Sequence, residues 1–478
     1  MTASPPRQIA VIGGGITGLA AAYRLTRLAP EATIVVIERE GRPGGKIQTE
    51  RVDGFIIDAG PDSFLSIKPR GIGLCQELGI AGHLTGPDPA HRRTYVLTGG
   101  KLHRLPEGLT GLIPTRLGPI ARTRLISPRG KARMALDFVL PPRRDERDES
   151  LAAFVERRLG REAYARLIEP LMAGIYAGDG HQLSLAATFP QLRAGELTHG
   201  GLIKGVLAGR KLTAPLAPDA PRPGFLSLPG GLGNLVDTLE AHLRAAGVRF
   251  LLGAEVTALR ARAAGGFHIV TAADPDLTAD SAIVTTPAWE AAALLQALDP
   301  ALATTLAAIP HVSTATVSLA YPQCALARPL DGYGYVVPRA EGRAVLAMTW
   351  VSTKWPGRAP EGFALLRGFI GRAGQPDPLE RSDTELVDLL RAEARDVLGI
   401  TAPPAARWVF RWPAGMPQYT LGHLERIAAI ERAVAEHSGL AIAGAALRGV
   451  GIPDCIASGE AAAHRVASWM GPADPRTG

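Results

Sequence analysis

The fold of this chain is constrained most strongly by residues 9–25, IAVIGGGITGLAAAYRL. Four apolar residues run into Gly13, Gly15 and Gly18, and a helix-like pattern follows. In such a strand–turn–helix unit, the first glycine allows a tight turn and the second lets a pyrophosphate approach the backbone. The third glycine lets the helix pack closely on the strand. The pyrophosphate lies at the helix N-terminus, where free N–H groups and the helix dipole attract negative charge. The stretch therefore predicts a dinucleotide site.

The residues after this unit indicate which dinucleotide is bound. Glu38 ends the apolar run TIVVIE twenty residues beyond Gly18, where its carboxylate can accept a hydrogen bond from a ribose hydroxyl. Residues 38–46 add a second glycine pair with a flanking arginine and lysine, and residues 54–63 add another glycine-bearing turn. Glycine turns let backbone amides meet phosphate, and nearby cations offset its charge. These segments resemble the GG-doublet flavoproteins, which include monoamine oxidases, phytoene desaturases and porphyrinogen oxidases. The resemblance implies FAD.

The C-terminal part carries a second unit of this kind. Residues 439–467 predict a short strand, a glycine-rich loop and a helix that begins near Pro453, since proline suits the first turn of a helix. A helix N-terminus aimed at the pyrimidine edge of a flavin would stabilise negative charge there. A helix that serves only packing is the alternative, but it does not account for the glycine-rich loop.

The length of 478 residues exceeds what one hydrophobic core supports, so two or three domains are expected. Strand-like and helix-like patterns alternate at both ends, whereas the region after residue 90 is basic and punctuated by Gly and Pro up to a Pro-rich linker at 214–224. We expect an α/β fold with a Rossmann-like FAD-binding domain of the monoamine-oxidase type, a mixed-sheet substrate domain and a helical subdomain. The FAD-binding domain takes residues 1–90, 222–290 and 406–478, the helical, basic, substrate- or membrane-facing subdomain takes 91–221, and the substrate domain takes 291–405.

The net charge of +7 is concentrated in one segment. Residues 91–150 hold 13 Lys/Arg against 6 Asp/Glu, so this segment alone carries the whole excess. A concentrated positive region favours an acidic ligand or an anionic membrane surface, although it can also be a solvated face. No nucleic-acid motif accompanies the charge, so a nucleic-acid partner is not expected.

The composition also bounds the compartment. The three cysteines, Cys75, Cys324 and Cys455, form no CxxC pair, so neither a disulfide framework nor a metal site is expected. The sequence MTASPPRQ leads directly into the first predicted strand, which leaves no room for a signal peptide. The charge-free residues 300–327 contain prolines and a strand-like stretch, so they do not predict a spanning helix. We expect a cytoplasmic protein, with peripheral contact to an anionic membrane as a further option.

Four motifs in order along the chain identify a narrower family. GPDSF (60–64), EPLMAGIYAGD (169–179), MPQYTLGHL (416–424) and GVGIPDCI (449–456) resemble the oxygen-dependent porphyrinogen oxidases of haem biosynthesis. The resemblance extends over nearly the whole chain. Such enzymes oxidise either coproporphyrinogen III or protoporphyrinogen IX, and the last two motifs are more similar to the bacterial coproporphyrinogen type. Protoporphyrinogen IX oxidase is the alternative, and a ferrochelatase is an expected downstream partner.

The resemblance implies a reaction in which the cofactor performs the difficult step. A porphyrinogen loses six hydrogens in three hydride transfers to the flavin, with O2 as acceptor and H2O2 as product. The hydride leaves a meso carbon flanked by pyrroles that stabilise the cation, so no strong protein base is required. The protein orients the substrate and excludes water. The lack of a Ser/His/Asp arrangement is therefore no argument against an enzyme, and no catalytic side chain is assigned.

The family pattern implies a set of FAD contacts. Tryptophan Trp412 is preferred over Trp408 because it lies closer to the MPQY motif, and a core position is the alternative for both. Cys455 lies inside the last predicted helix and no cysteine precedes MPQY, so the flavin is expected to be non-covalent. The predicted FAD contacts are Gly13, Gly14, Gly15, Ile16, Thr17, Gly18, Glu38, Arg39, Lys46, Gly60, Pro61, Asp62, Ser63, Val256 (through its backbone), Trp412, Val450, Gly451 and Ile452.

The same pattern implies substrate contacts. Arg93 matches the position of a propionate-binding arginine, although its neighbour Arg92 could substitute because the spacing to the following Gly-Gly pair differs by about one residue. Gly174 is a candidate for a backbone carbonyl that faces the pyrrole N–H groups. Tyr335 and Val337 are expected to form an apolar wall, and an ordinary core strand explains their sequence equally well.

Two other functions are compatible with parts of the sequence. A flavin amine oxidase or carotenoid desaturase would use the same fold, but a desaturase would need a long apolar tunnel where this chain is basic. A non-catalytic nucleotide-binding scaffold would share the glycine turn, and a yellow purified protein would exclude it.

Overall fold

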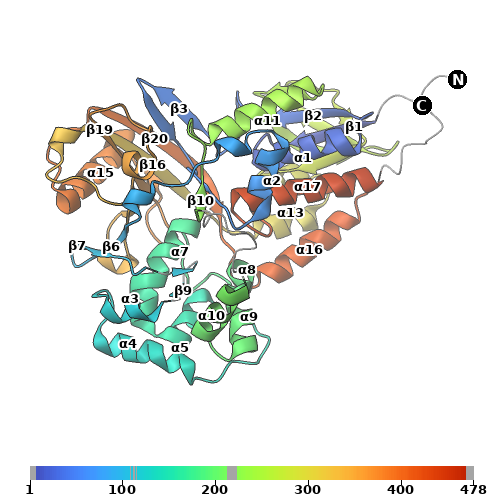
Figure 1. Ribbon diagram of the computed structural model, residues 1–478. Helices are drawn as coiled ribbons and strands as arrows, with labels where there is room; N and C mark the ends of the chain where they lie inside the picture. Colours follow the sequence, from blue (N-terminus) through green and yellow to red (C-terminus); the bar gives the residue numbers. More distant parts are fainter. Residues whose placement is uncertain (1–6, 108, 111–112, 115, 213–222, 470–478) are drawn as a thin grey trace.

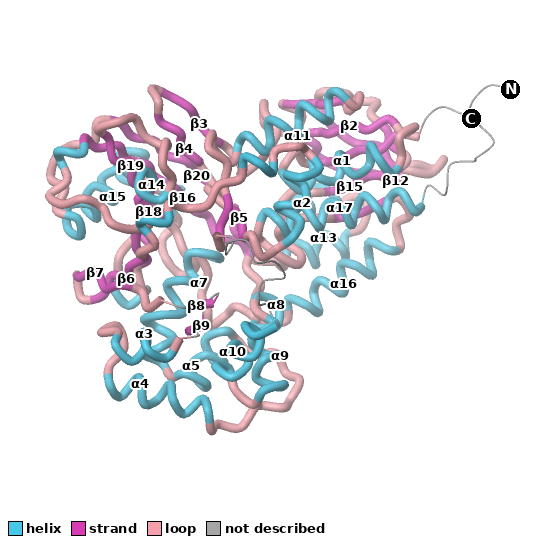
Figure 2. The backbone as a smooth tube through the Cα atoms, viewed as in Figure 1, coloured by secondary structure: helices cyan, strands magenta, loops and turns pink. Residues whose placement is uncertain are grey.

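The computed structural model describes residues 7–107, 109–110, 113–114, 116–212 and 223–469. Figure 1 shows three parts: a parallel sheet between helices at the right, a mixed sheet at the left and a group of helices at the bottom. Figure 2 shows the same division by secondary structure. The predicted fold class is confirmed. The predicted linker at 214–224 lies almost entirely outside the described residues.

The parallel sheet is assembled from segments far apart in the sequence. Its order is β11-β2-β1-β15-β21 and every neighbouring pair is parallel. Both faces are covered, which explains why the strands are continuous apolar runs. The strands are β1 (Gln8–Ile12), β2 (Thr33–Glu38), β11 (Arg249–Leu252), β15 (Ser281–Val284) and β21 (Leu440–Ile442).

Alternate residues of these strands serve two separate cores. Ile9 and Val11 of β1 face one core, and Ala10 and Ile12 face the other, since successive side chains point to opposite faces. The first core contains α1 (Ile16–Leu28), α2 (Pro69–Glu77), α11 (Gly233–Ala245) and α17 (Ile452–Trp469). The second contains β12 (Val256–Ala261), β13 (Phe267–Thr271), β14 (Thr278–Ala279), α12 (Ala288–Leu295), α13 (Pro300–Ala307) and α16 (His423–Ala435).

The mixed sheet crosses two of the predicted domain boundaries. Its order is β20-β16-β19-β18-β17-β6-β7, and only the β17–β6 pair is parallel. β6 and β7 come from the segment predicted as helical, and β20 from the segment predicted to close the FAD-binding domain. The mixed sheet therefore crosses the predicted boundaries at 91 and 406, because strands from distant segments pair within it. The strands are β6 (Thr94–Thr98), β7 (Lys101–Arg104), β16 (His311–Pro322), β17 (Gly334–Val336), β18 (Val345–Trp350), β19 (Phe363–Ile370) and β20 (Ala406–Pro417).

Smaller elements complete this part of the molecule. Helix α15 (Asp383–Leu398) begins with a capping box between Ser382 and Glu385 and packs its apolar side on one face of the mixed sheet. The others are α14 (Val351–Lys354) and the strand pairs β3 (Thr49–Val52) with β4 (Phe55–Asp58), β5 (Phe64–Leu65) with β10 (Phe225–Leu226), and β8 (Leu109–Thr110) with β9 (Ile113–Pro114).

The helical subdomain has its own apolar core and a buried ion pair. The guanidinium of Arg158 donates to the carboxylate of Asp137 at 2.6 Å, and both side chains are fully buried. The helices are α3 (Leu117–Arg122), α4 (Pro128–Ala135), α5 (Leu151–Leu159), α6 (Arg161–Ala163), α7 (Glu169–Tyr176), α8 (Leu185–Thr188), α9 (Pro190–His199) and α10 (Leu202–Leu212). Among the described residues, no helix combines the length and apolar character needed to cross a bilayer. Residues 300–327 contain α13 and the whole of β16, so they form no spanning helix.

Candidate active site

The predicted glycine turn joins β1 to α1 at the carboxyl edge of the parallel sheet. Gly13 has a φ of +104° and its N–H donates to the carbonyl of Ile37. A Cβ atom at Gly18 would lie 2.0 Å from the Gly13 carbonyl oxygen, so only glycine allows this approach of helix and strand. A Cβ at Gly15 would meet no atom within 4 Å, so the backbone there faces open space.

Glu38 lies across this turn at the end of β2. Its carboxylate accepts hydrogen bonds from the N–H groups of Gly14, at 2.7 Å, and Glu40, at 2.9 Å. Its neighbour Arg39 is half exposed and pairs with Glu290 of α12 at 2.7 Å. Val256 is the first residue of β12, which follows β11 in the sequence, and it is half-buried. Glu38 thus fixes the glycine turn, and its contact with a ribose hydroxyl stays a prediction.

The carboxyl ends of β1 and β15 lie side by side, which is where a dinucleotide site is expected. In open parallel sheets, ligands bind outside the carboxyl ends of the strands where the strand order reverses. Thr285 donates to the Gly13 carbonyl, and the buried hydroxyl of Thr286 has no hydrogen-bond partner among the described residues. The open backbone at Gly15 and this unpaired hydroxyl fit a bound phosphate group. Neither threonine was predicted, although polar residues directly after a buried strand were the available signal.

The second glycine pair lies against the first turn. The N–H of Gly44 donates to the carbonyl of Gly14 at 2.8 Å, and Gly15 and Gly44 form a parallel bridge. Arg42 donates to the carbonyl of Gly45 and to the side chain of Gln48, so its guanidinium shapes its own turn. A Cβ atom at Gly44 would lie 2.9 Å from a methyl group of Val236, so this turn also packs on the first turns of α11.

Lys46 brings an unpaired cation to the site. Its ammonium forms no ion pair with any described carboxylate, and burial lowers its pKa. A Cβ at Gly60 would lie 2.1 Å from the Lys46 carbonyl oxygen, so the predicted segments around Lys46 and Gly60 are in direct contact. An available cation beside a glycine turn suits an anionic group of a cofactor.

Asp62 is the centre of a buried network between the two sheets. Its carboxylate accepts from the Lys354 ammonium and the Trp355 indole, both at 3.0 Å, and pairs with Arg367 at 3.2 Å. Although burial opposes ionisation, these cations hold the pKa of Asp62 well below its usual range. Its carboxylate is therefore satisfied by the protein, so any cofactor contact from residues 60–63 comes from the backbone or from Pro61 and Ser63, which are partly exposed.

The two candidate tryptophans lie at different places on β20. The indole of Trp412 donates to the carbonyl of Ala59 at 3.3 Å, and its ring lies beside Gly60. Trp408 packs on Phe55 with ring centroids 5.4 Å apart in a separate apolar cluster. Of the two, Trp412 is the one that adjoins the predicted cofactor residues.

The closing helix α17 begins at Ile452, one residue before the predicted position. Its Gly459 allows close packing on α1, because a Cβ there would lie 2.1 Å from the Thr17 carbonyl oxygen. Asp454 in its first turn accepts from the Gly451 N–H at 3.3 Å and pairs with Lys68 at 2.5 Å. Helix α17 thus packs in the same core as α1, and Val450, just before it, packs on the core of the helical subdomain.

Gly174 lies near the end of α7, where the helix meets the mixed sheet. It is exposed and a Cβ there would meet nothing within 4 Å. Its neighbours Ala173 and Ala177 form an apolar cluster with Leu346 and the half-buried Phe369 and Met416. The open space at Gly174 therefore borders an apolar surface shared by the helical subdomain and the mixed sheet.

The prediction for Tyr335 and Val337 is wrong. They are 2% and 0% exposed in the core between the mixed sheet and α15, and the Tyr335 hydroxyl donates to Glu393 of α15 at 3.1 Å. Since side chains alternate along a strand, the intervening Val336 faces the other way and packs on the core of the helical subdomain. The alternative, an ordinary core strand, describes these two residues.

Arg93 and Arg92 are both exposed at the start of β6. Arg93 forms an ion pair with Asp331, and Arg92 makes no ion pair with a described carboxylate.

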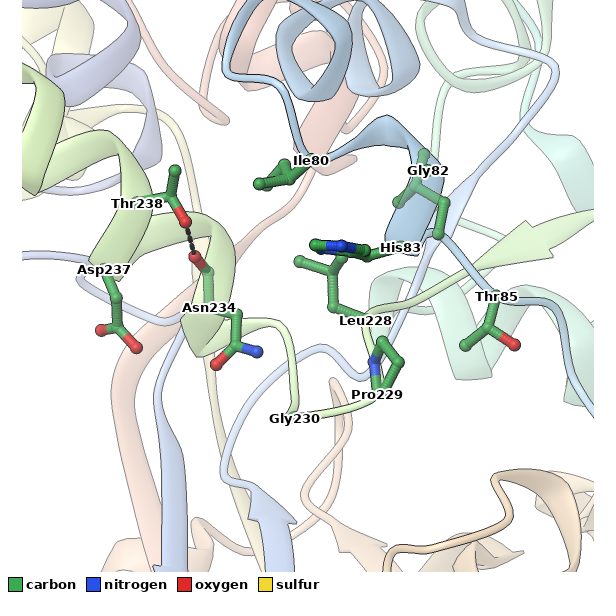
Figure 3. Close-up of a pocket in the computed structure, with 11 residues that line it drawn as sticks. Ile80, Gly82, His83, Thr85, Leu228, Pro229, Gly230, Asn234, Asp237 and Thr238 are labelled. Atoms are coloured by element: carbon green, nitrogen blue, oxygen red, sulfur yellow. Dashed lines mark hydrogen bonds between the residues drawn. The ribbon is translucent and has the colours of Figure 1, made fainter.

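A separate cavity of about 650 Å³ lies between α11 and the loop after α2, lined in part by His83, Leu228 and Asn234 (Figure 3). None of its lining residues belongs to the predicted cofactor or substrate set.

A parallel sheet with a glycine turn, next to a mixed-sheet domain, is typical of dinucleotide-dependent oxidoreductases, and the comparisons with known proteins identify the class as a flavin-dependent oxidoreductase. The chain belongs to the family of flavin containing amine oxidoreductases, which it matches over residues 16–467. It is 38% identical to coproporphyrinogen III oxidase from Bacillus subtilis (strain 168), over 97% of this chain and 98% of that protein. It is 34% identical to protoporphyrinogen oxidase from Bos taurus, over 96% of this chain and 98% of that protein. The crystal structure of a putative protoporphyrinogen oxidase from Exiguobacterium sp. 255-15 has 33% identity and a TM-score of 0.84, over 97% and 99%.

Proposed function

We propose that this enzyme is an FAD-dependent oxidase that converts coproporphyrinogen III to coproporphyrin III in porphyrin and haem biosynthesis. The observation that carries the proposal is the nearly full-length, 38% identity to the Bacillus subtilis coproporphyrinogen III oxidase. Protoporphyrinogen IX oxidase is the second candidate, supported by the 34% identity to the bovine enzyme. A flavin amine oxidase or carotenoid desaturase is more distant, because the chain is 38% and 34% identical to these porphyrinogen oxidases but 18% identical to a cyclohexylamine oxidase from Brevibacterium oxydans IH-35A.

The residues at the carboxyl edge of the parallel sheet would hold FAD without a covalent bond. Gly13 to Gly18 and Thr286 would receive the pyrophosphate, Glu38 the ribose, and Lys46, Trp412 and residues 450–452 the flavin end. Bound FAD supplies the hydride acceptor, and O2 takes the electrons to give H2O2. No side chain need act as a strong base.

The chain's own contribution is to bind and orient the substrate and to exclude water. The half-buried Phe369 and Met416, which pack on the buried Ala173, Ala177 and Leu346, would offer a dry surface for a tetrapyrrole, and the carbonyl of Gly174 is a candidate acceptor for its pyrrole N–H groups. Arg93 and Arg92 would attract the propionates. The exposed arginines of α3 and α4, among them Arg122 and Arg129, would serve an anionic membrane surface, and a ferrochelatase would take up the product downstream.

A side-by-side assay tests this proposal. Porphyrin fluorescence is followed with coproporphyrinogen III and with protoporphyrinogen IX, at low and at high ionic strength, together with H2O2 release. The substrate with four carboxylates should have the higher kcat/KM at low salt, and its advantage should shrink as salt screens the basic segment. A preference for protoporphyrinogen IX at every salt concentration would establish the second candidate instead.

A further inference from the structure

The loop between β21 and α17 is held by side chains from a different part of the chain. This loop, residues 444–451, leads to the predicted flavin contacts Val450 and Gly451. The hydroxyl of Tyr419 donates to the Ala445 carbonyl at 2.6 Å and accepts from the Gly449 N–H at 2.7 Å. One oxygen atom therefore bridges both ends of the loop.

His423 makes a third contact with the same loop. Its Nε2 lies 2.8 Å from the Leu447 carbonyl oxygen, and its ring stacks on Tyr419 with centroids 4.1 Å apart and planes at 15°. Both side chains are fully buried. Because Nε2 faces a carbonyl acceptor, it carries the proton of the neutral ring. The stacked pair thus presents two donors and one acceptor to the backbone of three residues of the loop, Ala445, Leu447 and Gly449.

The residue before Tyr419 reaches the opposite side of the site. The amide of the buried Gln418 donates to the carbonyl of Tyr176, the last residue of α7, at 2.8 Å. Tyr176 and Tyr419 also pack together, with ring centroids 5.9 Å apart. Neighbouring side chains of one extended segment therefore contact both α7, which carries Gly174, and the loop at 444–451.

We propose that Tyr419 is a positioning residue that fixes the loop at 444–451 relative to α7, and thereby sets the position of the flavin-facing backbone at Val450 and Gly451. Gln418 and His423 support it from either side. This inference rests on the proposed function only in taking Val450 and Gly451 as flavin contacts. It explains why the sequence MPQYTLGHL has Gln, Tyr and His at these places, a motif to which no chemical role had been assigned.

The variant Tyr419→Phe isolates the hydroxyl. Phenylalanine keeps the ring and its stack on His423, but it leaves the half-buried Gly449 N–H and Ala445 carbonyl without this partner. The loop then loses the one group that joins its two ends. Tyr321→Phe is the matched control, because Tyr321 is equally buried in the core between the mixed sheet and α15, in which no residue of the loop takes part.

The experiment measures flavin properties before substrate is added. Tyr419→Phe should raise the dissociation constant of FAD roughly tenfold. It should also shift the flavin midpoint potential and visible spectrum, and lower kcat with little change in KM. Tyr321→Phe should leave all of these at the wild-type values. A Tyr419→Phe protein with lowered Tm but unchanged potential, spectrum and kcat would overturn the inference.

A second pair of variants covers the case in which Tyr419→Phe does not fold. His423→Gln can keep an N–H donor near the position of Nε2, whereas His423→Leu cannot. The glutamine variant should retain the flavin potential and spectrum, and the leucine variant should shift both; equal behaviour of the two would contradict the inference. A yellow wild-type protein that oxidises neither porphyrinogen would refute the proposed function while leaving these flavin measurements valid.

Discussion

The guanidinium of Arg93 forms an ion pair with the carboxylate of Asp331, which also accepts a hydrogen bond from the Tyr95 hydroxyl at 2.7 Å. The side chains of Arg93 and Asp331 are 47% and 50% exposed, so both remain accessible to an incoming ligand. A guanidinium that already has a carboxylate partner binds a propionate only in competition with that partner. Asp331 therefore weakens any contact between Arg93 and a substrate.

Removing this competition should strengthen substrate binding. We expect Asp331→Asn to lower KM for coproporphyrinogen III several-fold with kcat nearly unchanged, because charge pairing to propionates is mostly uniform binding. Arg93→Ala should raise KM by roughly tenfold at low salt and less at high salt. Steady-state kinetics of both variants and of Arg92→Ala decide the matter. If neither arginine variant alters KM, the propionates bind elsewhere.

Two glycines of the same turn should respond differently to alanine. Gly15→Ala places its methyl group where no protein atom lies within 4 Å, so the apoprotein should keep its Tm while FAD binding weakens at least tenfold. Gly18→Ala forces a Cβ to within 2.0 Å of the Gly13 carbonyl oxygen and should destabilise the apoprotein itself, by about 1–3 kcal/mol. Thermal unfolding without FAD and FAD titration separate the effects. Equal losses of apoprotein stability would contradict this assignment.

The flavin should leave the protein on denaturation. Cys455 is buried inside α17, and burial raises the pKa of its thiol to about 11, so it is a poor nucleophile. Acid precipitation should therefore release all of the yellow colour into the supernatant, as measured by its absorption spectrum. Colour that remains in the washed pellet would show a covalent bond.

The stability of the protein should fall in mild acid because of His423. Burial lowers the pKa of His423 from 6.5 to about 4, so the unfolded chain binds this proton more readily than the folded protein. The contribution of neutral His423 to the free energy of unfolding is complete above pH 6.5 and is lost as the pH falls toward 4. The loss is on the order of 2 kcal/mol by pH 4.5. Chemical unfolding of wild type and His423→Gln over this pH range measures it. The variant should show the shallower pH dependence, and parallel curves would exclude His423 as the cause.

Several features followed from the sequence because they depend on neighbouring residues. The glycine turn of β1 and α1, the two glycine pairs and the proline in the first turn of α17 are each specified by local backbone requirements. Apolar runs without alternation indicated strands buried on both faces, and the parallel sheet has them. These local signals predicted the fold class and a dinucleotide, and the family resemblance of the same segments predicted the flavin.

The tertiary structure alone decided which distant groups meet. β6 pairs with β17, more than two hundred residues away, so the mixed sheet crosses a predicted domain boundary. Tyr335 and Val337 point into the core because the register and burial of β17 determine which face is covered, and period-two alternation in the sequence does not name the covered face. Asp331 reaches Arg93, and Tyr419 reaches Ala445 and Gly449, only after the chain has folded. The partner of a side chain depends on how remote segments pack in three dimensions. Local sequence therefore predicted the individual turns and helix ends of the site, and only tertiary contacts decided which residues meet there.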